Sequence, residues 1–125
     1  MSVAAAIRIT SPDEERVIRH AAEFAQQQHT PCFVISIVRH LPYGAVKQEE
    51  HDAVRRNLEL ITAAQAAPIM QEGENIAKSL LSVACAFGIR TLFLQSGVSP
   101  PLGRSVAEQL LYLQPPFDVI VVSSE

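Results

Sequence analysis

Five short apolar runs alternate with four stretches of helical periodicity along the chain. The second run, from Cys32 to Val38, is apolar and rich in β-branched residues at successive positions. Such a run is typical of a strand that is buried on both faces of a parallel sheet. The alternation predicts one α/β domain over residues 1–125, with a mostly parallel sheet covered by helices. The predicted strands are residues 4–9, 32–38, 67–71, 91–95 and 117–123.

Capping and breaking residues mark the expected helix boundaries. Ser11, Pro12 and Glu14 stand where an N-cap, a first helical residue and a capping-box glutamate stand, so the first helix is predicted from there to about Gln28. Gly88 is predicted to end the third helix. The second helix is predicted over about residues 46–65, with Val54, Leu58 and Ile61 facing inward. The third is expected between Gly73 and Gly88, and the fourth from near Gly103 to Pro115.

Composition narrows the class of protein. Hydrophobic residues make up 48% of the chain and charged residues 18%, which is typical of a globular domain. The net charge is −3 and the ten basic residues are scattered, which argues against a nucleic-acid surface and against a polybasic membrane anchor. No apolar run approaches the roughly 20 residues of a membrane helix, and the first residues do not resemble a signal peptide. We therefore expect a cytoplasmic protein without membrane insertion.

Two cysteines and an acidic run are the remaining candidates for sulfur or metal chemistry. Cys32 and Cys85 belong to no CxxC pair, and both are expected to be buried small hydrophobic residues. Residues 48–52 combine glutamates, a histidine and an aspartate, but consecutive helical residues point in different directions. This run is expected to offset the helix dipole in solvent rather than to bind a metal.

Ligands of a doubly wound fold bind beyond the carboxyl ends of the strands, where the strand order reverses. The candidate loops are therefore residues 10–11, 38–45, 71–73 and 95–105. The sequence contains no GxxxxGK[ST], GxGxxG or GxSxG motif. A receiver domain is rejected because Thr10 and Gln71 stand where it needs acidic residues. We expect no catalytic residues.

Three stretches, taken in order, resemble the universal stress protein family. Residues 11–22 resemble its first turn and helix, and residues 88–94 the lead into its fourth strand. Residues 105–111 followed by 117–122 resemble its last helix and strand. The resemblance spans nearly the whole chain and is closest to the subgroup found as a domain in osmosensitive potassium-channel sensor kinases. It implies a doubly wound, Rossmann-like, five-stranded sheet of order 3-2-1-4-5 with helices on both faces.

The resemblance also implies homodimers that pair through the last strand. Physical reasoning points the same way, because an exposed apolar edge strand is usually blunted or paired. The residues expected on this dimer edge are Val119, Val121 and Ser123.

Many members of the family bind ATP, with an acidic residue after strand one and a Gly-x-x-Gly-x9-Gly-Ser/Thr motif after strand four. Here Thr10 stands at the acidic position, Gln95 at the first glycine, and the loop is several residues shorter than the motif. One interpretation keeps an anion site at the start of the fourth helix, with Arg104 supplying charge. In the other interpretation, the shortened loop no longer binds a nucleotide and Ser105 serves as an N-cap. The candidate nucleotide or anion-binding residues are Thr10, Ser11, Val38, Gly97, Gly103, Arg104 and Ser105.

Two functions follow from these observations. The first is a non-catalytic regulatory domain like the universal stress proteins, which acts through dimerisation or through contacts with a signalling partner. The alternative is a protein that binds ATP or another adenine nucleotide, with weak ATPase activity. The chain is either a whole protein or a domain of a larger sensor or transporter.

Overall fold

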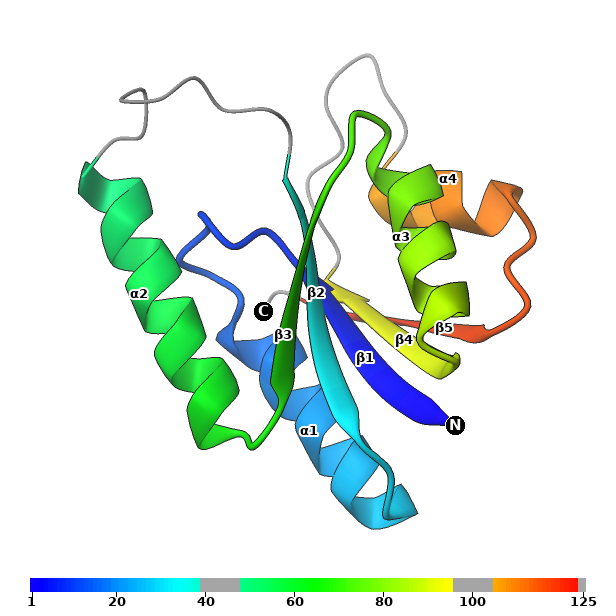
Figure 1. Ribbon diagram of the computed structural model, residues 1–125, viewed down its shortest axis with the longest axis horizontal. Helices are drawn as coiled ribbons and strands as arrows, with labels where there is room; N and C mark the ends of the chain where they lie inside the picture. The colour runs from blue at the N-terminus through cyan, green and yellow to red at the C-terminus, as the bar shows by residue number, and fades with distance from the viewer. Residues whose placement is uncertain (39–47, 96–104, 124–125) are drawn as a thin grey trace.

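The computed structural model describes residues 1–38, 48–95 and 105–123, which form a five-stranded sheet with helices on both faces (Figure 1). The strand order is β3-β2-β1-β4-β5, and all four strand pairings are parallel. This confirms the doubly wound fold expected from the sequence. The strands are β1 (Ser2–Ile7), β2 (Cys32–Val38), β3 (Ala67–Glu72), β4 (Ile89–Gln95) and β5 (Asp118–Val122), and the helices are α1 (Glu15–Gln28), α2 (Gln48–Ala63), α3 (Ile76–Ala86) and α4 (Val106–Tyr112).

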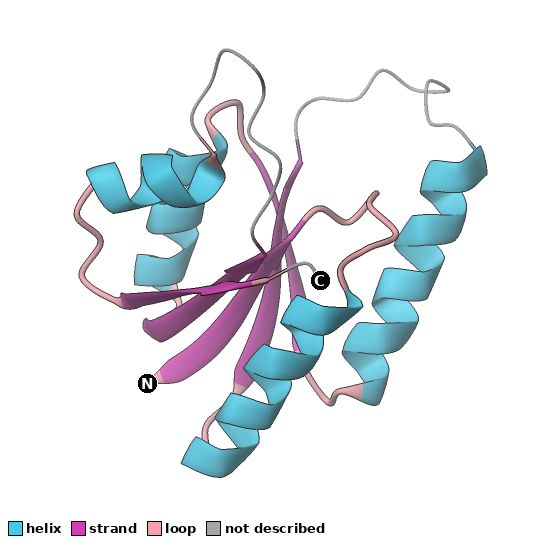
Figure 2. Ribbon diagram, turned by 180° about the vertical axis from the view of Figure 1, so that it is seen from behind, coloured by secondary structure: helices cyan, strands magenta, loops and turns pink. Residues whose placement is uncertain are grey.

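The central strand β1 divides the core into two halves. Its side chains alternate between the two faces, so Ala5 and Ile7 pack on the side of α1 and α2, whereas Ala4 and Ala6 pack on the side of α3 and α4. Figure 2 shows the two helical layers on either side of the sheet. All six residues of β1 are buried. Because three of them are consecutive alanines, helices can approach the middle of the sheet closely from both sides.

The predicted capping box at the start of α1 is wrong. The helix begins at Glu15 after the cap residue Glu14, and no side chain caps it. The Ser11 hydroxyl instead accepts a hydrogen bond from the Asp13 N–H (3.4 Å), within the loop. The Glu14 carboxylate reaches back to the Arg8 N–H (3.1 Å), so tertiary contacts in the loop replace the local capping pattern.

The inward face of α2 differs from the predicted one. Leu58 is 38% exposed, whereas the adjacent Asn57 is only 1% exposed. Ile61 is buried and Val54 half-buried, as the pattern indicates. The buried positions Ala53, Asn57 and Ile61 follow at intervals of four, which places them on one helix face. An asparagine is tolerated there because its amide is hydrogen-bonded to the backbone, as described below.

The remaining boundaries and burial assignments agree with the prediction in part. Gly88 has the left-handed φ of +65° that favours glycine after a helix, as predicted. Asn75 caps α3, accepting from the Lys78 N–H at 3.0 Å, which the sequence prediction missed. Cys32 is buried as expected, but Cys85 is exposed, so the prediction that both are buried is wrong. The reason is that Cys85 lies on the face of α3 that points away from the sheet, between the buried Ala84 and the exposed Ala86.

Candidate functional site

The strand order reverses between β1 and β4, and this defines the crevice where the sequence places its candidate residues. The chain leaves β1 toward α1 on one face of the sheet, and α4, which follows β4, lies on the other face (Figure 1). The described residues of this crevice come from the segment after β1, the ends of β2 and β4, and the start of α4. Gly97, Gly103 and Arg104 lie outside the described residues.

A tight turn follows β1, at the point where the strand order places the crevice. Its Ser11 N–H donates to the Arg8 carbonyl at 2.9 Å. The strand ends at Ile7 rather than at the predicted Ile9, so Arg8 is the first residue beyond it and its side chain is exposed. Thr10 is half-buried and Ser11 buried in the same turn. The structure therefore brings these two predicted residues together and adds a cation that the sequence analysis did not select.

Two buried polar side chains below the turn fix its backbone. The Asn57 amide nitrogen donates to the carbonyls of Ile9 and Ser11, each at 2.8 Å. The Ile9 N–H donates to the Ser36 hydroxyl at 3.2 Å. Sequence reasoning missed both side chains. Ser36 was detectable as the single polar residue within the apolar run of β2, whereas Asn57 stands between Arg56 and Leu58 in a stretch of mixed polarity and gave no such signal.

Glu14 closes the turn from the side of α1. It is buried, and its carboxylate accepts from the Arg8 N–H. Burial raises the pKa of the Glu14 carboxyl, and the hydrogen bond from the Arg8 backbone together with the charge of Arg8 oppose part of this rise. The raised pKa favours the neutral acid, so the contribution of this group to stability decreases as the pH rises through its folded-state pKa.

The other predicted residues of the crevice have structural partners of their own. The Val38 carbonyl at the end of β2 accepts from the Gly73 N–H at 3.0 Å. A Cβ at Gly73 would lie 2.1 Å from the Ser79 hydroxyl oxygen, so a larger residue here would require the Ser79 side chain to move. Ser105 is the N-cap of α4 and its hydroxyl accepts from the Glu108 N–H at 3.1 Å, as the second of the two interpretations expects. The helix begins at Val106, slightly later than the predicted start near Gly103.

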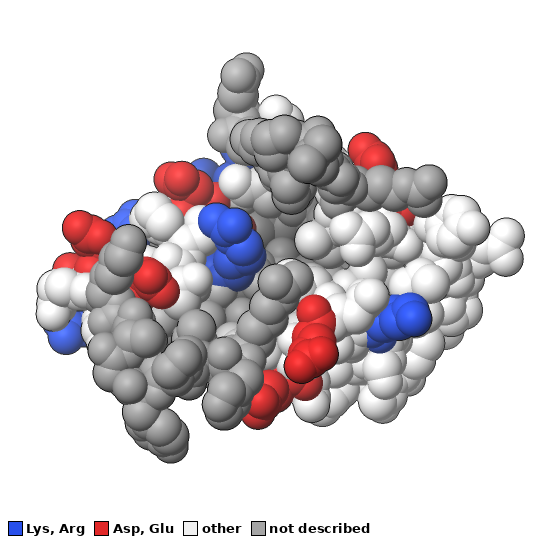
Figure 3. All heavy atoms as spheres, turned by 90° about the horizontal axis from the view of Figure 1, so that it is seen from above, with Lys and Arg blue, Asp and Glu red and all other residues white. Residues whose placement is uncertain are grey.

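Figure 3 looks onto the carboxyl ends of the strands, where acidic and basic side chains of the described residues are interspersed. Among residues 1–38, 48–95 and 105–123 no group of three His, Cys, Asp or Glu side chains could hold a metal ion. No described helix is both long enough and apolar enough to cross a membrane.

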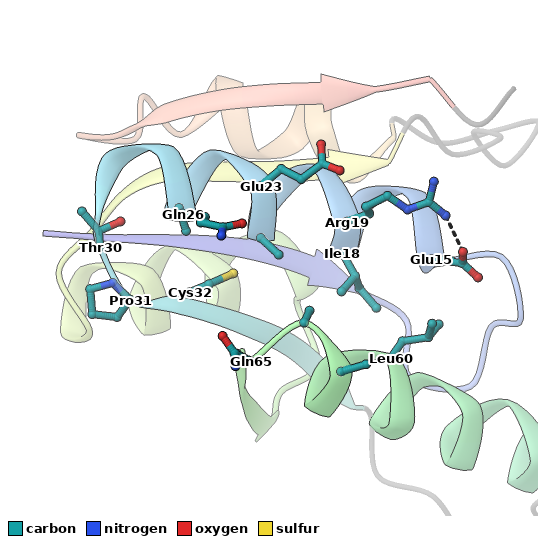
Figure 4. A pocket seen from close by; sticks show the side chains of 14 residues that line it. Glu15, Ile18, Arg19, Glu23, Gln26, Thr30, Pro31, Cys32, Leu60 and Gln65 are labelled. Atoms are coloured by element: carbon teal, nitrogen blue, oxygen red, sulfur yellow. Dashed lines mark hydrogen bonds and ion pairs between the residues drawn. The ribbon is translucent and has the colours of Figure 1, made fainter.

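A groove lies between α1 and α2, and none of the turn residues after β1 lines it (Figure 4). It has a volume of about 490 Å³, and none of the predicted site residues lines it. Glu15 forms ion pairs with Arg19 on its own helix and, at 2.9 Å, with Arg56 of α2. Cys32 lies in the wall, where burial raises the pKa of its thiol to about 11. A thiol with this pKa is protonated at neutral pH, so the groove holds no activated nucleophile at Cys32.

The two edges of the sheet differ in a way that bears on association. Strand β5 pairs only with β4 among the described strands. Its Val121 is 47% exposed, Ile120 is also exposed, and Val119 is half-buried. Ser123 follows the strand, and its carbonyl accepts from the Arg16 guanidinium at 3.1 Å. The opposite edge, β3, contains Pro68 in its interior.

Comparisons with known proteins support the fold. No family model matches the sequence, and no curated protein matches it. A universal stress protein from Archaeoglobus fulgidus is 22% identical with a TM-score of 0.67, and the match covers 97% of each chain. A universal stress protein from the same organism in complex with dAMP is 22% identical, with a TM-score of 0.62 over 97% of this chain and 96% of that chain. A universal stress protein in complex with cAMP is 14% identical, with a TM-score of 0.71 over 98% of both chains. The chain therefore has the fold of the universal stress proteins.

Proposed function

We propose that this protein is a non-catalytic regulatory domain of the universal stress protein type, which acts in the cytoplasm by pairing with a second copy through β5. The observation that carries the proposal is the exposed apolar edge formed by this strand. An edge strand presents backbone N–H and C=O groups, and a second chain can pair with them. Burial of the exposed parts of Ile120 and Val121 would add a hydrophobic contribution.

The contrast with β3 supports β5 as the pairing edge. Proline within a sheet is confined to edges because it lacks the N–H that a pairing strand needs. Pro68 stands in the interior of β3, and Glu72 ends that strand. The proline discourages edge-to-edge pairing. Strand β5 contains no proline, and its one charged residue is Asp118 at its start, as Glu72 is the one charged residue of β3.

The molar mass in solution tests this proposal. Size-exclusion chromatography with light scattering at micromolar concentration should give twice the 13.7 kDa of one chain. A mass of one chain throughout this concentration range would overturn the proposed dimer.

Each copy in a dimer keeps a surface that a regulatory partner can contact. The resemblance to a sensor-kinase domain favours a signalling protein as this partner.

A second candidate function is the binding of an adenine nucleotide in the crevice, with weak ATPase activity. Two proteins of the same fold are described in complex with cAMP and with dAMP, and this favours the candidate. The residues that would contact the nucleotide come from the turn after β1, the end of β2 and the segment between β4 and α4. They are Thr10, Ser11, Val38, Gly97, Gly103, Arg104 and Ser105.

Thermal unfolding with ATP, ADP, AMP and Mg²⁺ tests the second candidate. A nucleotide at 100 times its dissociation constant should add about 2.7 kcal/mol to the free energy of unfolding. Arg104→Ala should reduce this increment, whereas Arg90→Ala, which changes an exposed arginine near the start of β4, should leave it unchanged. Absence of any shift at millimolar nucleotide would eliminate this candidate.

A further inference from the structure

We propose that Asn57 is a positioning residue of the crevice, which sets the backbone conformation of residues 8–11 and so determines what this part of the crevice can bind. The inference rests on the second candidate function only for the identity of the ligand. The control of the turn by an α2 side chain follows from hydrogen bonds between described residues.

The Asn57 side chain holds two carbonyls of one turn. Its amide nitrogen carries two N–H groups, and these donate to Ile9 and Ser11 at 2.8 Å each. These carbonyls belong to the residues on either side of Thr10, so the amide makes both point toward α2. The turn is also closed internally by the bond from the Ser11 N–H to the Arg8 carbonyl.

Two further side chains hold the N–H groups of the same turn. Ser36 of β2 accepts from Ile9, and Glu14 accepts from Arg8. The amides of Arg8, Ile9 and Ser11 are thus all hydrogen-bonded, and so are the carbonyls of Arg8, Ile9 and Ser11. The turn is fixed before any ligand arrives, which lowers the entropy that a ligand must overcome on binding.

The chemistry of the asparagine argues for this role over a packing role. Asn57 is among the most buried side chains of the protein, and its Oδ1 atom has no hydrogen-bond partner in the structure. A buried amide with an unpaired oxygen is unfavourable, and an apolar residue of similar size would fill the same space without that cost. The feature that leucine cannot supply is the pair of N–H donors.

Hydrogen exchange of Asn57→Leu tests the proposal, with Ile61→Val as the matched control on the same buried face of α2. Loss of two hydrogen bonds should raise the exchange rates of the Arg8, Ile9 and Ser11 amides by roughly tenfold or more relative to the amides of β1 and β2. The control should raise exchange, if at all, evenly over the protein. Asn57→Asp keeps the shape but can supply at most one donor, so it cannot hold both carbonyls and should also raise exchange at the turn.

The outcomes separate the positioning role from the nucleotide candidate. Unchanged relative exchange at the turn in both Asn57 variants would overturn the positioning role, whatever the nucleotide result. If the wild-type protein binds ATP, Asn57→Leu should weaken binding by about tenfold while Ile61→Val leaves it unchanged, because the former releases the turn. If wild-type protein binds no nucleotide, the candidate function fails and the exchange data alone decide the role of Asn57.

Discussion

Val121→Lys is expected to convert the proposed dimer into a monomer. Val121 is 47% exposed and pairs with Leu94 in the β4–β5 ladder. Lysine at this position can extend into solvent in a single chain, so the monomer should remain folded. In a symmetric dimer the two lysines would lie near each other at the shared edge, and like charges across an interface cost several kcal/mol. Self-association should therefore weaken by roughly 100-fold or more.

Sedimentation equilibrium over a dilution series measures this change, and Met70→Lys provides the matched control. Met70 is 54% exposed on the opposite edge strand β3, so the control adds the same charge to the other edge of the sheet. The control should keep the wild-type dissociation constant. Equal weakening by both variants would indicate a general effect of charge, and weakening by the control alone would place the interface at β3.

Leu110→Ala is expected to lower the free energy of unfolding by about 2–5 kcal/mol, the range for truncation of a fully buried leucine. Leu110 is completely buried and is the one fully buried side chain of the short helix α4. It belongs to the core between α3, α4 and the sheet. Removal of its side chain leaves a cavity beneath α4, and it weakens the attachment of the helix that precedes β5.

Urea unfolding at equilibrium measures this loss, and the adjacent residue supplies the control. Leu111 is 53% exposed, so Leu111→Ala should change stability by no more than about 0.5 kcal/mol. Similar losses in both variants would contradict the assigned orientation of α4. Leu110→Ala could also disturb self-association. The molar mass of the variant, measured without urea where it is fully folded, shows whether it does.

Much of the fold followed from the apolar pattern, and the failures have physical causes. The run of β2 predicts a buried parallel strand, because strands covered by helices on both faces are apolar at successive positions. The capping pattern at Ser11 failed because tertiary hydrogen bonds hold the loop. A local signal is overridden when a distant side chain satisfies the same backbone groups, as Asn57 does for the Ser11 carbonyl.

Only those residues of the candidate site that directly follow a strand could be predicted from the sequence. Thr10 and Ser11 lie in the crevice because β1 ends just before them. Asn57 was not predictable, since its partners are 46 and 48 residues away and the neighbouring Leu58 fits the apolar stripe better. The dimer edge, Val119, Val121 and Ser123, and the residues Gly97, Gly103 and Arg104 stay predictions that the experiments above address.

Hydrogen exchange of the β5 backbone as a function of protein concentration tests the central claim most directly. At concentrations where the dimer forms, the outward-facing amides of Asp118–Val122 should be protected, and dilution should expose them. The amides of Ala67–Glu72 that face away from β2 should exchange rapidly at every concentration, because Pro68 discourages pairing at that edge. Outward-facing β5 amides that exchange at the same rate at all concentrations would contradict pairing through this strand.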